Sequence, residues 1–112
     1  MEERIPRKPV EVSSKFDASL ADIYDYSCDT FGIIQADRYR EIIRVSLRTL
    51  PDRYLSYPLC RHIPAKSRMY RNIILDSHLI IYRVTTARIE VLDIVHGAMS
   101  VSRIRATRKI RV

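Results

Sequence analysis

The chain has 112 residues, of which 46% are hydrophobic and 29% are charged, and its net charge is +7. This length predicts a single domain over residues 1–112, and the apolar content is too high for a disordered tail. The positive charge favours a polyanionic partner, either nucleic acid or an acidic protein. The longest apolar run, residues 79–82, is too short to cross a bilayer, and residues 1–12 contain no signal-peptide segment. We therefore expect a cytoplasmic protein that does not engage a membrane.

Cysteine and histidine are too sparse to suggest a metal site. The cysteines, Cys28 and Cys60, fall in different expected elements, and the histidines are His62, His78 and His96. Their spacing matches no common arrangement of metal ligands, and two unpaired thiols are typical of a reducing cytosol. The sequence therefore predicts neither a metal nor a cofactor.

The first elements in chain order are a strand and a helix. Residues 1–8 are mostly polar, and we expect a loose lead-in there. Residues 9–14 predict a short strand because apolar and polar side chains alternate. A helix is predicted from Phe16 to Phe31, where apolar side chains recur at steps of three and four, and Gly32 predicts its end. The expected apolar face consists of Phe16, Leu20, Ile23, Tyr24, Ser27 and Phe31.

A second amphipathic helix is predicted from Ile34 to Leu50, and we expect it to end because Pro51 follows. Two such helices, joined by one or two residues, predict an αα-hairpin that lies on a sheet. The expected apolar face of the second helix consists of Tyr39, Ile42, Ile43, Leu47 and Leu50.

The remainder of the chain is typical of strands. Residues 59–63 predict a weak short strand, and three stronger strands are expected at residues 69–75, 79–84 and 89–95. Residues 101–112 combine five basic residues with apolar ones and contain no acid, so they are either a basic tail or a terminal strand. The order predicts an α+β domain, β-α-α-β-β-β with one further strand, in which the helical hairpin packs on one face of a mostly antiparallel sheet.

The segment from His78 to Gly97, HLIIYRVTTARIEVLDIVHG, resembles the end of the RelE/ParE toxins of bacterial type II toxin–antitoxin pairs. In that family a Tyr-Arg-Val strand precedes an IEIL-x-V-L-H-G-A-R-D strand. Met99 and Ser100 depart from this pattern, where many members have Arg-Asp. Element order and shorter motifs in both helices extend the resemblance over residues 9–100. The positions that match in register are Ile89, Glu90, Leu92, His96, Gly97 and Ala98.

This resemblance implies a toxin of a plasmid stabilisation module, neutralised by a cognate antitoxin with which it forms a hetero-oligomer. ParE-like members bind and inhibit DNA gyrase without catalytic residues, whereas RelE-like members cut mRNA on the ribosome. In one nuclease subgroup an Arg that contacts the scissile phosphate occupies the position of Leu79. We therefore rank gyrase inhibition first, mRNA cleavage second, and a member that only binds its antitoxin third, which favours a binding protein over an enzyme.

The resemblance also implies two sets of candidate site residues. For the nuclease alternative they are His96 as a base, Arg71 and Arg83 as phosphate-binding cations, and Tyr82 as a stacking group. The competing interpretation of His96 is a strand-end residue that bonds to backbone and lets Gly97 adopt an unusual dihedral angle. The acidic tail of the antitoxin needs cations on the toxin. Those that we expect to receive it are Arg40, Arg44, Arg48, Arg103, Arg105 and Arg108.

Overall fold

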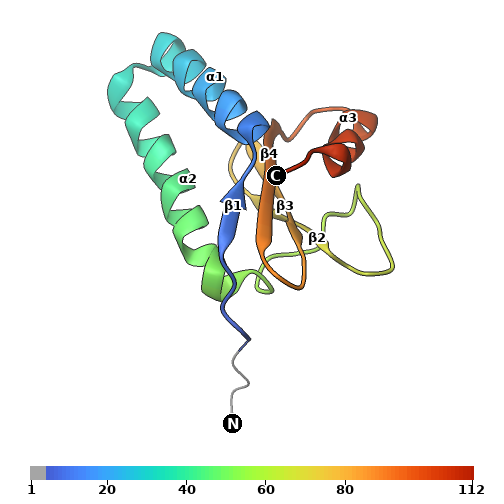
Figure 1. The fold of residues 1–112 in the computed structure, drawn as a ribbon. Coiled ribbons are helices and arrows are strands. Elements are labelled where there is room, and N and C mark those ends of the chain that lie inside the picture. Colours follow the sequence, from blue (N-terminus) through green and yellow to red (C-terminus); the bar gives the residue numbers. More distant parts are fainter. Residues whose placement is uncertain (1–4) are drawn as a thin grey trace.

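A computed structural model describes residues 5–112 and arranges them as a four-stranded sheet, a helical hairpin and a short C-terminal helix (Figure 1). The expected α+β class is confirmed, and the hairpin packs on one face of the sheet. In this part of the chain no helix is long and apolar enough to span a membrane. The elements are β1 (Val10–Val12), α1 (Ser14–Phe31), α2 (Ile33–Arg53), β2 (Tyr70–Ile74), β3 (His78–Val84), β4 (Ile89–His96), α3 (Val101–Ala106) and the 3-10 helix η1 (Thr107–Lys109).

The sheet has the strand order β1-β4-β3-β2. β1 runs parallel to β4, with Val10 opposite Ile89, and the other neighbours are antiparallel, as expected. β4 is a central strand whose residues from Ile89 to Val95 are all buried, because both faces of the sheet are covered. The long strands therefore present a different packed surface on each side of the sheet.

Local sequence signals set the limits of α1. The side chain of Ser13 accepts the backbone N–H of Phe16 at 2.9 Å, which caps the first turn. Gly32 ends the helix as predicted, and it does so with a φ of 89°, a left-handed conformation that favours glycine. Its N–H donates to the carbonyl of Cys28, and α2 starts at the next residue, so the two helices form the expected tight hairpin.

The main core lies between the hairpin and the sheet, where Phe16 and Ile43 contact buried side chains of β3 and β4. Two of the predicted face positions are wrong. Phe31 is 57% exposed and Ile42 is 53% exposed. Successive residues of a helix turn by about 100°, so Ile42 points away from the sheet when Ile43 points toward it. Phe31 is the last residue of α1 and lies at the tip of the hairpin.

The predicted end of the second helix is also wrong. α2 continues through Pro51 to Arg53. Proline removes one N–H from the hydrogen-bond ladder, but Pro51 lies in the last turn, where few helical bonds depend on it. The carbonyl of Pro51 accepts the N–H of Lys8 at 3.2 Å, which ties this end of the helix to the N-terminal segment.

A second, smaller core covers the opposite face of the sheet. Ile81 and Leu92 of the sheet pack there against Cys60, Ile63 and Ile104. The strand expected at residues 59–63 is wrong, because only Leu59 makes a bridge, to Arg71, and the following residues form turns. Prolines at positions 58 and 64 flank this segment, and proline lacks the N–H that a ladder needs.

The C-terminal segment is neither a tail nor a strand, so both alternatives for residues 101–112 are wrong. The side chain of Ser100 accepts the N–H of Arg103 at 3.4 Å and starts α3. Ile104 and Thr107, three residues apart, are both buried against the sheet. The short helix therefore forms because it covers apolar surface that the hairpin leaves open on the other side.

The expected loose lead-in is only partly testable, because residues 1–4 lie outside the described range. Residues 5–8 have no regular secondary structure, but they contact the rest of the domain. The hydroxyl of Tyr54 donates to the carbonyl of Pro6 at 2.6 Å, and the Lys8 ammonium donates to the carbonyl of Thr85 at 2.6 Å. Contacts from α2 and from the β3–β4 turn thus hold this segment.

Candidate functional site

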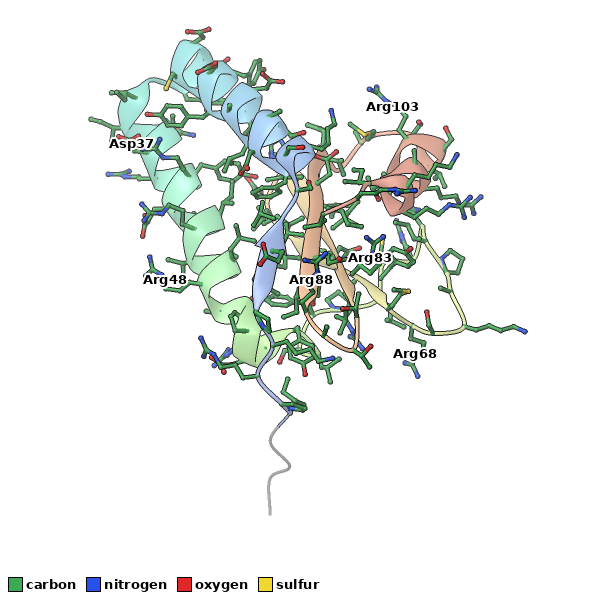
Figure 2. All side chains as sticks on the ribbon, in the orientation of Figure 1. Asp37, Arg48, Arg68, Arg83, Arg88 and Arg103 are labelled. Atoms are coloured by element: carbon green, nitrogen blue, oxygen red, sulfur yellow. The ribbon has the colours of Figure 1, made fainter. Side chains whose placement is uncertain are left out.

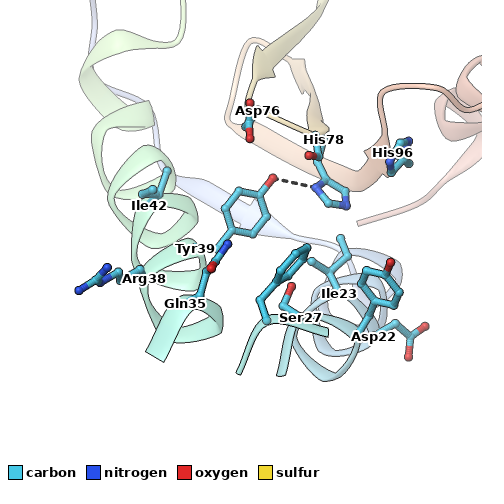
Figure 3. A pocket seen from close by; sticks show the side chains of 13 residues that line it. Asp22, Ile23, Ser27, Gln35, Arg38, Tyr39, Ile42, Asp76, His78 and His96 are labelled. Atoms are coloured by element: carbon cyan, nitrogen blue, oxygen red, sulfur yellow. Dashed lines mark hydrogen bonds between the residues drawn. The ribbon is translucent and has the colours of Figure 1, made fainter. Parts of the chain in front are cut away.

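A groove of about 680 Å³ opens between the two helices of the hairpin and the start of β3 (Figure 3). Its walls come from four places in the chain: Asp22 belongs to α1, Arg38 to α2, Asp76 to the β2–β3 turn and His96 to the end of β4. The lining is mixed, with apolar side chains beside a few charged ones at the rim. The lining residues are Asp22, Ile23, Tyr26, Ser27, Phe31, Gln35, Arg38, Tyr39, Ile42, Asp76, Ser77, His78 and His96.

The hairpin around this groove exposes much apolar surface. Among the described residues nine large hydrophobic side chains are exposed, and six of them belong to α1 and α2. Two of these, Phe31 and Ile42, are the residues that helical periodicity had assigned to the core. Three of the six, Tyr26, Phe31 and Ile42, also line the groove, and exposed apolar side chains beside a groove are typical of a surface that another molecule covers. The six are Tyr26, Phe31, Ile33, Ile34, Ile42 and Val45.

One end of the groove is closed by a tyrosine and two histidines. The hydroxyl of Tyr39 lies 2.7 Å from Nδ1 of His78, and the rings of His78 and His96 are 5.4 Å apart (Figure 3). Burial raises the pKa of Tyr39 above 10.0, while burial and then the proximity of His96 lower the pKa of His78 below 6.5. Both Tyr39 and His78 are therefore neutral at pH 7, and the tautomer of His78 sets which of the two donates in their hydrogen bond.

His96 also bonds to backbone at the end of its strand. Its Nδ1 accepts the N–H of Ala98 at 3.1 Å, which agrees with the structural interpretation of this residue. The accompanying expectation for Gly97 is wrong, because its φ does not lie in the positive region. A Cβ at Gly97 would meet only the carbonyl of Ser77, at 3.7 Å. The catalytic role of His96 stays a prediction.

The other candidate catalytic residues do not converge on His96. Arg83 lies five residues from the His78–His96 pair along β3, about 17 Å away, and faces the opposite side of the sheet from Tyr82. Tyr82 is fully buried, and its hydroxyl donates to the carbonyl of Tyr54 at 2.6 Å, so no ring face is free to stack. Arg71 donates to the carbonyl of Tyr57 at 2.6 Å. These four side chains cannot act on one phosphate together.

Sequence reasoning missed the role of Glu90, which lies between two arginines. Nε of Arg83 donates to Oε1 at 2.7 Å, and Nε of Arg88 donates to Oε2 at 2.9 Å. Burial opposes ionisation of Glu90, but the two arginines outweigh it and hold its pKa below the usual value. In the sequence, the one signal for Glu90 was its match, together with Ile89, to the family's last-strand pattern. Within residues 5–112 no group of three or more His, Cys, Asp or Glu side chains could hold a metal.

The six arginines expected to receive an antitoxin fall on two separate surfaces. Arg40 lies 4.4 Å above the ring of Tyr24 and 3.4 Å from Asp37, while Arg48 lies further along the same side of α2. The other set of three arginines belongs to α3 and η1. Figure 2 shows Arg48 and Arg103 on opposite sides of the molecule. One short peptide cannot cover both sets. The set on α2 is Arg40, Arg44 and Arg48, and the C-terminal set is Arg103, Arg105 and Arg108.

Comparison with known proteins gives two similarities. A family model for the ParE toxin of type II toxin-antitoxin system, parDE, matches residues 10–101. A solved structure described as the chromosomal ParDE TA system from P. aeruginosa has a TM-score of 0.66 and 19% identity, over 82% of this chain and 98% of that chain. At this identity the second similarity concerns the fold alone. None of the curated proteins compared with this sequence matches it.

Proposed function

We propose that this chain, which belongs to the ParE toxin family of type II toxin–antitoxin systems, acts by binding and inhibiting DNA gyrase. It works in the bacterial cytoplasm, as part of a plasmid stabilisation module, until a cognate antitoxin neutralises it. The observation that carries a binding mechanism is the exposed apolar hairpin with its groove. The separation of Arg71, Arg83 and Tyr82 from His96 supports the same choice, since cleavage needs a base and a phosphate-binding cation together.

The groove supports docking of the antitoxin at the hairpin. An amphipathic segment of the antitoxin would place its apolar side chains against Ile42 and its neighbours, in the manner of a helix in a groove. Carboxylates on its flanks would meet Arg38 at the rim and the row formed by Arg40, Arg44 and Arg48. Docking of this kind combines apolar burial with charge pairing, so it is only partly sensitive to salt.

Gyrase inhibition is tested directly with purified components. Relaxed plasmid, gyrase and ATP are incubated with increasing amounts of the full chain, and supercoiling is measured on gels. We expect inhibition that is reversed by the antitoxin encoded beside the toxin gene. Normal supercoiling in the presence of correctly folded protein would contradict gyrase as the target. A protein that binds its antitoxin but inhibits nothing would correspond to the third-ranked alternative.

The docking site is tested with two substitutions of similar exposure. Ile42→Asp introduces a carboxylate into the groove from a side chain that is 53% exposed, so the fold should tolerate it. Leu55 is 46% exposed and lies outside the groove, which makes Leu55→Asp the matched control. We expect Ile42→Asp to weaken antitoxin binding by more than about tenfold, because a charge would be desolvated there. Equal effects of both substitutions would place the antitoxin elsewhere.

One observation favours the ribonuclease as a second candidate. Tyr39, His78 and His96 lie together at the groove, and a neutral histidine can act as a base near pH 7. Primer extension on ribosome-bound mRNA tests this alternative, and we expect no new cleavage sites. If the protein does cut mRNA in the ribosomal A site, and if His96→Ala and Arg71→Ala each abolish the cleavage without unfolding the protein, mRNA cleavage replaces gyrase inhibition as the proposed function.

A further inference from the structure

Charge is divided unevenly along this chain. Residues 1–52 contain eight basic residues (Lys and Arg) and ten acidic ones (Asp and Glu). Residues 53–112 contain twelve basic residues and three acidic ones. Within the second part, two long stretches, residues 53–75 and 94–112, have no acidic residue at all. The positive net charge therefore comes entirely from the second part of the chain.

The fold brings the two acid-free stretches together. The guanidinium of Arg105 donates to the carbonyl of His62 at 3.1 Å, and Ile63 and Ile104 share the second core. Figure 2 shows Arg68 and Arg103 on the side of the molecule away from α2. We name this surface the basic face. Its eight cations are all exposed, and none forms an ion pair within residues 5–112. They are Arg61, Lys66, Arg68, Arg103, Arg105, Arg108, Lys109 and Arg111.

Two further arginines hold the C-terminal part of this face in place. Arg83 donates to the carbonyls of Arg108 and Ile110 at 3.1 and 3.3 Å, and Arg88 donates to the carbonyl of Val112 at 2.9 Å. Both form ion pairs with Glu90, whose single negative charge offsets one of the two positive charges, while the cations on the surface have no ion pair within residues 5–112. The cations of the segment therefore project from a fixed backbone, and a ligand would not have to order it.

The chemistry of the basic face fits nucleic acid better than protein. Of the nine exposed large hydrophobic side chains only Val101 lies on it, whereas stable protein interfaces are built around apolar or aromatic anchors. An extended array of unpaired Lys and Arg is what a row of phosphates requires. We propose that the basic face binds the sugar–phosphate backbone of nucleic acid. This site is separate from the hairpin groove, and most of α3 and all of η1 lie beyond the family match to residues 10–101.

Fluorescence anisotropy of the full chain with two labelled probes tests the proposal. The probes are a duplex DNA of about two helical turns and a single-stranded RNA of equal length. The variant Arg103→Gln/Arg108→Gln/Lys109→Gln removes three side chains that make no hydrogen bond or ion pair in the described part of the chain. The matched control, Arg40→Gln/Arg44→Gln/Arg48→Gln, removes the same charge from α2. A second variant, Lys66→Gln/Arg68→Gln, alters the other segment of the face.

We expect the wild type to bind a probe with an affinity that falls steeply with salt. The C-terminal variant should lose more than about tenfold in affinity near 0.1 M salt, and its salt slope should fall by about one per lost phosphate contact. Lys66→Gln/Arg68→Gln should weaken binding less but in the same direction, and the α2 control should stay within about twofold. Comparison of the probes then separates a preference for DNA from one for RNA.

Three results would overturn the proposal. Equal losses in the C-terminal variant and the α2 control would show that net charge alone attracts the probe. Absence of binding by the wild type at low salt would remove the site altogether. A polyglutamate peptide that binds more tightly than either probe, and loses affinity in the C-terminal variant, would assign the basic face to an acidic protein. None of these results depends on whether gyrase is the target.

Discussion

The helical hairpin and the basic face expose different chemistry to solvent. The hairpin carries six of the nine exposed large hydrophobic side chains among the described residues, and two arginines of α2 are paired with acids of the same helix, Arg40 with Asp37 and Arg44 with Glu41. The basic face carries eight unpaired cations and a single exposed large apolar residue, Val101. Binding to the first surface would depend on apolar burial, and binding to the second on counterion release.

The contrast shows that net charge is a poor guide to where a small protein binds its partners. Arginines are present on both surfaces, yet on α2 acidic neighbours reduce their effective charge, and such exposed pairs contribute little energy. The C-terminal arginines form no ion pair with any acid of residues 5–112. A salt titration should therefore distinguish the two surfaces more sharply than removal of any single residue.

The largest expected effect separates the core of the hairpin from its surface. Ile43→Ala should lower the free energy of unfolding by about 2–5 kcal/mol, because this side chain is fully buried against the sheet. Ile42→Ala, one residue earlier and 53% exposed, should change it by less than about 0.5 kcal/mol. Urea denaturation of both variants checks this pair. Similar losses would mean that Ile42 is part of the core and that the groove is narrower than described.

A second expected effect concerns how the basic face is anchored. Glu90→Gln should lower the free energy of unfolding by on the order of 3 kcal/mol, because it leaves Arg83 charged and largely buried without a counter-ion. Amide hydrogen exchange in residues 101–112 should quicken more than exchange in α1. Unchanged protection of that segment would show that apolar packing alone holds α3.

The smallest expected effect is a pH dependence from the same group. The pKa of Glu90 is lower in the folded protein than its ordinary value of 4.5, so its ion pairs stabilise the fold above pH 4.5. That contribution should decline as the pH falls below 4.5 toward the folded pKa. Urea midpoints of wild type and Glu90→Gln should therefore converge on acidification. If the difference in urea midpoint between the two proteins stays constant down to strongly acidic pH, the ion pairs of Glu90 are not the source of this stability.

Much of the fold followed from local sequence patterns. Helical spacing before Pro51, strand-type runs after it and Gly32 between the helices all act over a few residues. The expected hairpin, the first strand and the three stronger strands were found, whereas the weak strand at residues 59–63 was not. The C-terminal helix was not predictable in this way. Ile104 and Ile110 fit several patterns, and α3 forms because it covers one face of the sheet, which is a tertiary contact.

The candidate sites were less accessible to sequence reasoning. The pairing of Tyr39 with His78 joins residues from α2 and β3, and the three-residue contact of Glu90 with Arg83 and Arg88 depends on strand register. The exposure of Ile42 depends on which of two adjacent isoleucines faces the sheet, which periodicity alone leaves open. The six candidate cations for the antitoxin stay a prediction, and the sequence alone could not show that they divide between two surfaces.

Simultaneous binding tests the separation of the two surfaces most directly. Labelled duplex DNA is bound to the full chain, a saturating amount of the antitoxin's acidic tail peptide is added, and the anisotropy of the DNA is measured. If the peptide occupies the hairpin groove and the DNA the basic face, both should bind together, and the DNA affinity should change by less than about threefold. Release of one DNA for each peptide bound would show that both partners compete for the basic face, and the division into two surfaces would be wrong.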